Sequence, residues 1–203
     1  MSEPGKITAT VGEDGIAEVV VDYPPVNALP VAGWFELART VRGLGEDEKV
    51  RVVILAATGR GFNAGVDIKE IQREGKAALI GANRGCFEAF AAVYECAGPV
   101  IAAVNGFCRC GGIGLTGNAD VIVAASDATS ALPEVDRGAL GAATHLSRLV
   151  PLHKARAMMY TSATATAAEL HAFGSVLEVV PRAELRTAAM AVAAEIAAKN
   201  TTV

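Results

Sequence analysis

Residues 110–121, CGGIGLTGNADV, constrain the fold more than any other part of the chain. They contain G-x-G-x-x-G at positions 112–117, and an apolar run at 99–104 precedes it, which is the pattern of a dinucleotide-binding turn. A crossover to the next parallel strand takes at least about 10–12 residues, but the next strand is predicted to begin at Asp120. The spacing therefore argues against a dinucleotide fold. It leaves an anion- or oxyanion-binding turn, or glycines that only permit close packing.

Segments typical of strands alternate with segments of helical periodicity along the chain. Strands are expected at 16–22, 52–57, 100–105, 120–124 and 177–180, and helices at 31–43, 68 onward, 77–96, near 112, up to 149, 153–162, after 166, and 182–200. Loops are expected at 23–30 and from 106 to the helix start. Thr166 and Glu169 have the spacing of a capping box. The alternation predicts a single α/β domain over residues 1–203.

Composition and charge argue against several classes of protein. The net charge is −4 with scattered basic residues, so no nucleic-acid partner is expected. No apolar run approaches the roughly 18 residues that span a bilayer, and the first residues lack the apolar segment of a secretory signal. The four cysteines have no zinc-binding spacing. We therefore expect a cytoplasmic protein with reduced thiols, no metal and no membrane span.

A second glycine turn, GRGFNAGVD at 59–67, follows the strand predicted at 52–57. Two such turns could supply two converging backbone N–H donors, the minimum for holding an oxyanion. The ordered motifs PPVNAL, GFNAGVDIKE, PVIAAVNGFCRCGGIGLTGNADVIVAA and LPEVDRG resemble the crotonase, or enoyl-CoA hydratase/isomerase, superfamily. The resemblance implies a spiral of ββα units, a homotrimer or hexamer, and an acyl-CoA thioester as substrate, with no separate cofactor.

The resemblance also assigns roles by position. The backbone N–H groups of Ala64 and Gly111 would hold the thioester enolate, and Glu134 would be a catalytic carboxylate. Contacts to the acyl-CoA would come from Val26, Ala28, Ala64, Gly65, Val66, Asp67 and Ile68. Asp67 could instead cap the helix that follows it, whereas Asn27 and Asp120 are interpreted as structural.

The reaction depends on a missing carboxylate. Hydratases of the superfamily use two glutamates, and the first of them falls at Gly114, which has no side chain. Each positioned acid or base contributes about 10²–10⁴-fold, so efficient hydration is not expected. Within the superfamily the motifs look most like actinobacterial CoA-ester hydrolases of steroid-ring catabolism. That resemblance implies retro-Claisen opening of a cyclic ketone, with an enoyl-CoA hydratase or isomerase, or a non-catalytic acyl-CoA-binding subunit, as alternatives.

Two further side chains near Glu134 have open roles. His145 could shuttle a proton near neutral pH, or could be a capping or interface histidine. Arg137 could pair with Glu134 or meet a substrate carbonyl, or could be a surface arginine. No role is expected for His153 or His171.

Packing around the site raises three more expectations. Phe87, Phe90 and Tyr94 have helical spacing and could wall an apolar acyl pocket or belong to the core. Cys110 stands where the superfamily usually has glycine, and it could crowd the loop beside the oxyanion donor. Superfamily members usually continue with further helices that build the trimer. Residues 183–203 are therefore expected to be the first helix of that region, with the rest missing and activity reduced.

Overall fold

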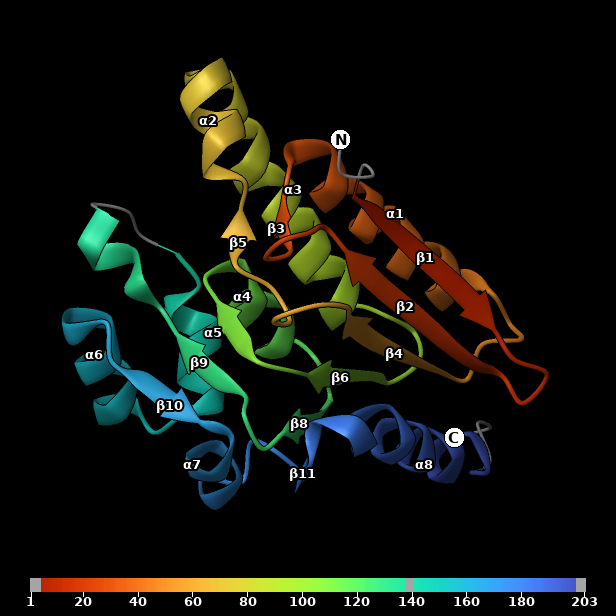
Figure 1. Ribbon diagram of the computed structural model, residues 1–203. Helices are drawn as coiled ribbons and strands as arrows, with labels where there is room; N and C mark the ends of the chain where they lie inside the picture. Colours follow the sequence, from red (N-terminus) through yellow and green to blue (C-terminus); the bar gives the residue numbers. More distant parts are fainter. Residues whose placement is uncertain (1–4, 138–140, 200–203) are drawn as a thin grey trace.

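The computed structural model describes residues 5–137 and 141–199, and a six-stranded sheet runs through its centre (Figure 1). The strands, in spatial order, are β1 (Lys6–Val11), β2 (Ile16–Asp22), β4 (Val52–Ala57), β6 (Val100–Val104), β8 (Val121–Ala125) and β11 (Glu178–Val180). β1 pairs antiparallel with β2, and all the other neighbours pair in parallel. Parallel strands covered on both faces are typically continuous apolar runs, which explains the sequences of β4, β6 and β8.

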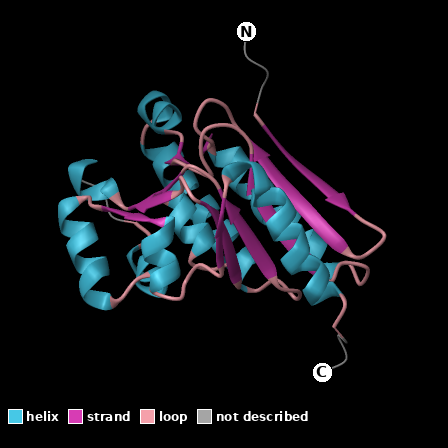
Figure 2. Ribbon diagram, turned by 60° about the horizontal axis from the view of Figure 1, so that its bottom comes forward, coloured by secondary structure: helices cyan, strands magenta, loops and turns pink. Residues whose placement is uncertain are grey.

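Helices cover both faces of this sheet, as Figures 1 and 2 show. On one face lie α1 (Val31–Glu46), α3 (Lys76–Tyr94) and α4 (Gly111–Thr116), and on the other lies α8 (Leu185–Ala197). Successive residues of β4 alternate between two cores because side chains alternate along a strand. Val53 and Leu55 pack with the α1 and α3 side, whereas Val52 and Ile54 pack with α8. The α/β prediction is confirmed.

Two small sheets were not predicted. One contains β7 (Phe107–Arg109), β9 (Thr129–Ala131) and β10 (Thr164–Thr166), and the other joins β3 (Ala28–Leu29) to β5 (Gly65–Val66). The loops expected at 23–30 and from 106 onward are therefore wrong where β3 and β7 lie. These strands of two or three residues depend on distant partners, such as β9 for β7, that a local pattern cannot reveal.

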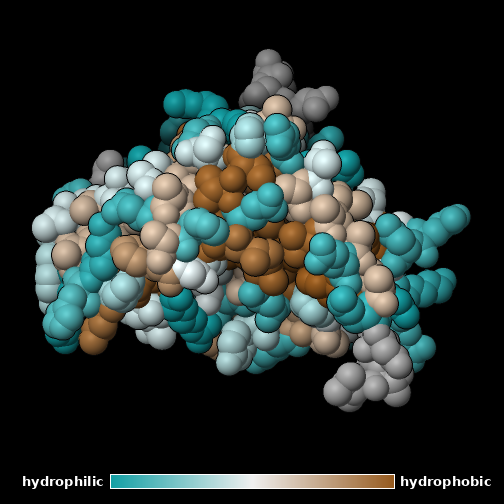
Figure 3. Space-filling view, turned by 90° about the horizontal axis from the view of Figure 1, so that it is seen from below, coloured by the Kyte–Doolittle hydropathy of each residue, from teal (hydrophilic) through white to brown (hydrophobic). Residues whose placement is uncertain are grey.

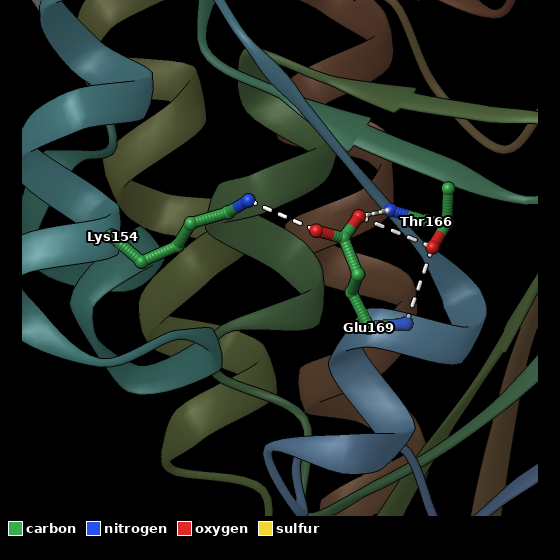
Figure 4. A network of polar contacts seen from close by, with 3 residues as sticks. All are labelled: Lys154, Thr166 and Glu169. Atoms are coloured by element: carbon green, nitrogen blue, oxygen red, sulfur yellow. Dashed lines mark hydrogen bonds and ion pairs between the residues drawn. The ribbon is translucent and has the colours of Figure 1, made fainter.

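The remaining helices form the end of the molecule beyond β9. They are η1 (Pro133–Arg137), α5 (Ala143–Leu149), α6 (Leu152–Thr161) and α7 (Ala167–Ala172), while α2 (Ile68–Glu74) follows β5 and η2 (Arg182–Glu184) precedes α8. The predicted capping box is confirmed (Figure 4). Thr166 Oγ accepts from Glu169 N at 3.2 Å, and Glu169 accepts from Thr166 N at 2.8 Å and pairs with Lys154 at 3.0 Å.

The face of the sheet beside α8 is only partly covered. Seen from below, it carries strongly hydrophobic side chains near its middle (Figure 3). A groove of about 440 Å³ lies on this side, with Val20, Ile54, Ala56, Ala103 and Leu185 among its lining residues. No helix in the described residues is long and apolar enough to cross a membrane. The groove lies on the opposite side of the sheet from α3 and from α4, whose first residue is Gly111.

Candidate functional site

The two glycine turns meet in space. One follows β4 and leads to Ala64 and β5, and the other follows the neighbouring strand β6 and leads through β7 to the start of α4. The Cβ of a side chain at Gly65 would stand 3.3 Å from Gly111 N, and one at Gly111 would stand 3.3 Å from Gly65 Cα. Two glycines thus let the backbones of the two turns approach closely. The structure therefore brings the backbone segments that contain Ala64 and Gly111 next to each other.

Buried asparagine side chains hold the first turn. Asn27 donates to the carbonyls of Thr58 and Gly61 at 2.8 Å each. Asn63 donates to Asn27 O at 2.7 Å and accepts from Gly65 N at 2.8 Å. Sequence reasoning missed Asn63, although a buried amide beside a glycine turn is a common way to satisfy turn backbone groups.

The N–H groups of Ala64 and Gly111 are weakly engaged. Ala64 N donates to Asn27 O at a long 3.4 Å. Gly111 is the first residue of α4, so its N–H has no acceptor inside that helix, and no other described residue accepts from it. Both groups therefore retain the capacity to donate to an oxygen placed between the turns.

Glu134, in η1, lies beside Cys110, the residue that precedes Gly111. Its side chain is half-buried, and burial raises its pKa above the usual carboxyl range, although the neighbouring Cys110 thiol offsets part of the rise. Within the described residues, its buried Oε2 has no hydrogen-bond partner. A carboxylate with a raised pKa and an unsatisfied oxygen is the kind of group that serves as a general base.

Cys110 precedes α4 with a positive φ of 53° and ψ of −113°. Its Cβ stands 2.6 Å from the position that a Cβ at Gly65 would take, so the glycine provides the room for this side chain. Burial first, and then the charge of Glu134, raise the pKa of the Cys110 thiol to about 12. The thiol is therefore protonated at neutral pH and is not a nucleophile.

An aromatic ring from another helix occupies the space next to Gly114. A Cβ at this position would overlap the ring of Phe90 on α3. Phe90 also meets Trp34 edge to face, with ring centroids 5.9 Å apart. The space that a side chain at position 114 would use is therefore already occupied.

Of the two possibilities left open for Phe87 and Tyr94, membership of the core is wrong. Their exposed fractions are 66% and 65%, whereas Phe90 is half-buried and packs against the core. They lie seven residues apart on the outer face of α3, whose buried face consists of small residues, including Ala82, Gly85 and Ala89. Helical spacing alone did not reveal which face of α3 turns inward.

His145 lies on α5 and packs against α4. Its ring meets Phe90 edge to face with centroids 5.2 Å apart, and a Cβ at Gly117 would stand 2.8 Å from His145 Cβ. Its Nδ1 lies 3.1 Å from Asn118 Nδ2. Burial, and then the charge of Arg148, lower the pKa of His145. The sequence motifs assign no role to Asn118.

The other expected site residues gather around β3 and β5. Ala28 pairs with Gly65, and Val66, Val26 and Asp67 are half-buried beside them, whereas Ile68 is exposed. Asp67 caps α2, because its side chain accepts from Lys69 N at 2.9 Å. Asp120 accepts from Val100 N at 2.8 Å, a structural role. The side chain of Arg137 lies outside the described residues.

In the described part of the chain, no group of three or more His, Cys, Asp or Glu side chains could hold a metal ion.

Comparison with known proteins gives consistent relatives. A family model described as "Enoyl-CoA hydratase/isomerase" matches residues 12–203. A (7aS)-7a-methyl-1,5-dioxo-2,3,5,6,7,7a-hexahydro-1H-indene-carboxyl-CoA hydrolase of Mycobacterium tuberculosis is 66% identical, over 97% of this chain and 80% of its own length. The protein of the same name from Rhodococcus jostii is 64% identical over 97% and 77%.

Solved structures show the same fold. An enoyl-CoA hydratase from Mycobacterium smegmatis superimposes with a TM-score of 0.89 at 30% identity, covering 95% of this chain and 77% of its own. Human enoyl Coenzyme A hydratase domain-containing protein 3 superimposes with a TM-score of 0.87 at 29% identity, over 94% and 77%. The hydratases thus share the fold at much lower identity than the two hydrolases.

Proposed function

Because the chain belongs to the enoyl-CoA hydratase/isomerase family, we propose that it is a CoA-ester hydrolase that opens a ring of a cyclic ketone CoA ester, as in steroid catabolism. The two relatives named as hexahydro-indene-carboxyl-CoA hydrolases support this reaction at 66% and 64% identity. The substrate in their names is bicyclic and carries two ring ketones, which gives the substrate class.

The observation that carries the proposal is the Glu134 carboxylate beside the two turns, together with the lack of a side chain at Gly114. Glu134 has an unsatisfied buried oxygen and a raised pKa, and the Phe90 ring takes the space where a side chain at Gly114 would lie. One positioned base suits the activation of water for attack on a ketone. One base is poorly suited to a hydration that needs two carboxylates.

In the proposed mechanism Glu134 removes a proton from a water molecule, whose oxygen forms a bond to the ring ketone carbon. The bond from that carbon to the neighbouring ring carbon then breaks. Its electron pair is delocalised onto the thioester oxygen as an enolate, to which the N–H groups of Ala64 and Gly111 donate. Protonated Glu134 supplies the proton that returns to carbon. The product contains the elements of one added water molecule. It has one ring fewer than the substrate and one new carboxylic acid group.

Substrate binding is proposed from the β3–β5 side of the junction. Val26, Ala28, Gly65, Val66 and Ile68 would contact the acyl-CoA, and Asp67 would contribute mainly through its backbone because its carboxylate caps α2. Coenzyme A is then part of the substrate, and no separate cofactor is proposed.

A homotrimer or hexamer is proposed from the family resemblance. The exposed Phe87 and Tyr94 rings support burial of this face in an assembly. A cytoplasmic location stays a prediction.

The test of Glu134 compares two substitutions in the same short helix. Glu134→Gln keeps the shape but removes the base, so turnover of a cyclic ketone CoA ester should fall by about 10²–10⁴-fold. Asp136→Asn changes an exposed acid two residues away and should leave turnover within a few-fold of the parent. Turnover is followed by the mass of the product. Equal rates for parent and Glu134→Gln would exclude Glu134 as the base. Robust hydration of crotonyl-CoA would favour a hydratase, and CoA-ester binding without turnover of any ester would favour a binding subunit.

A further inference from the structure

The orientation of the Asn118 amide is fixed by two partners that each have only one hydrogen-bonding role. The guanidinium of Arg148 can only donate, and it lies 2.5 Å from Asn118 Oδ1. The carbonyl of Gly114 can only accept, and it lies 2.7 Å from Asn118 Nδ2. Exchanging the oxygen and nitrogen of the amide would spoil both contacts. The NH₂ group of this buried side chain therefore lies on the side of Gly114 and the oxygen on the side of Arg148.

This orientation determines the protonation state of His145. Asn118 Nδ2 lies 3.1 Å from His145 Nδ1, and an NH₂ group can only donate. Nδ1 must therefore be the acceptor, without a proton of its own. A neutral imidazole with a bare Nδ1 carries its proton on Nε2. Burial and the positive charge of Arg148 lower the pKa of His145 and favour this neutral form.

His171 provides an internal contrast. Its Nδ1 lies 2.9 Å from the carbonyl oxygen of Val176, which can only accept. His171 must therefore carry a proton on Nδ1. One chain thus holds two histidines whose Nδ1 atoms have opposite hydrogen-bonding roles, each dictated by its neighbour.

The His145 ring lies at the Gly117 end of α4, against Phe90. Phe90 and the bare backbone of Gly117 fix its position, and Phe90 is the ring that fills the space at Gly114. α5, which carries His145, starts directly after Ala142, and a Cβ at the preceding Gly141 would stand 3.6 Å from Glu134 Oε1. Among the described residues, none forms a hydrogen bond with His145 Nε2. The Nε2–H is thus available to a ligand.

We propose that Asn118 and Arg148 are positioning residues that hold His145 as a neutral imidazole with its proton on Nε2, a donor for a ketone oxygen of the acyl group. The tautomer follows from the contacts of this chain alone. Only the identity of the acceptor rests on the proposed function. His145 then acts as a hydrogen-bond donor rather than as a base through Nδ1.

The first test reads the tautomers directly. Two-bond ¹H–¹⁵N correlation spectra of the labelled chain resolve the ring nitrogens of its three histidines. His145→Gln and His171→Gln variants assign the signals. At neutral pH we expect His145 to show a bare Nδ1 and a protonated Nε2, and His171 to show a protonated Nδ1. A proton on His145 Nδ1 would overturn the proposal, and the parent protein alone decides this.

The second test changes the positioning residue. Asn118→Asp keeps an acceptor for Arg148 but replaces the donor that faces Nδ1 with a carboxylate oxygen. His145 should then gain a proton on Nδ1, while the His171 signals stay unchanged and report an intact fold. An unchanged His145 tautomer in a variant with intact His171 signals would remove Asn118 from the positioning role.

The third test addresses the donor. His145→Gln places an amide NH₂ near the position of Nε2, whereas His145→Leu does not. For a cyclic ketone CoA ester, Leu should lower kcat/KM by about tenfold or more, and Gln should recover most of the loss. Equal kcat/KM for Leu and parent would exclude the donor role. If the parent opens no ring at all, the proposed function fails, whereas the tautomer result still stands.

Discussion

The two halves of the stretch at 110–118 use glycine for different purposes. In residues 110–112 the missing side chain of Gly111 brings one backbone against another, because Gly111 lies against Gly65. In residues 114–118 the missing side chains make room for rings from other helices, since Phe90 fills the space at Gly114 and His145 lies over Gly117. The same residue type thus shapes a polar junction at one end of α4 and an aromatic packing surface at the other. Substitution of the first half's Gly111 should affect catalysis most, and substitution of the second half's Gly114 should mainly affect stability.

The largest expected effect comes from Gly111→Ala. A Cβ there would stand 2.5 Å from Cη2 of Trp34, a fully buried ring, so the backbone of residue 111 must shift. Displacing an oxyanion donor typically costs about 10²–10³-fold in kcat. Steady-state kinetics on folded protein checks this. Gly43→Ala, on the exposed face of α1 with nothing within 4 Å, is the matched control and should leave kcat unchanged. A kcat near the parent value for Gly111→Ala would remove the first half from the reaction.

Gly114→Ala should act mainly on stability. Its Cβ would overlap the Phe90 ring, and overpacking of this kind costs about 1–3 kcal/mol of unfolding free energy. Phe90→Leu replaces the ring that causes the overlap with a smaller side chain. The two substitutions should therefore be non-additive by about 0.5–3 kcal/mol in a double-mutant cycle measured by urea unfolding. Additive effects would mean that Phe90 does not fill the space at Gly114, and the difference between the two halves would disappear.

The smallest expected effect is a pH dependence at Glu134. Burial raises its folded-state pKa above the ordinary value of 4.5. The stability that the neutral carboxyl contributes is therefore complete below that value and is lost as pH rises through the raised pKa. Glu134→Gln should remove this loss, so its unfolding free energy relative to the parent should increase across that window. Because the base must be ionised, the acid limb of kcat/KM should also lie above the ordinary carboxyl range. A constant stability difference across the window would contradict a raised pKa.

Local patterns predicted the long elements well, because their periodicity follows from burial. The strands at 16–22 and 52–57 and the capping box of α7 are observed as expected. The short strands β3, β5, β7, β9 and β10 were missed because each exists only through a partner distant in sequence.

The candidate site shows the same division. The ordered motifs pointed to Ala64, Gly111 and Glu134, and the fold brings the two turns that carry the first two together. Two features of residues 114–118 could not be predicted from local sequence patterns. Overlap of Phe90 with position 114 depends on how α3 is rotated, and the tautomer of His145 depends on an amide 27 residues away.

The most direct measurement is the fate of water oxygen during turnover. The chain is incubated with a bicyclic ketone CoA ester in ¹⁸O-labelled water, and the product is analysed by tandem mass spectrometry and ¹³C NMR. Retro-Claisen hydrolysis predicts one new carboxyl group that carries the ¹⁸O, together with loss of one ring. An ¹⁸O-labelled alcohol on a product with both rings intact would show hydration instead and would contradict the proposed reaction.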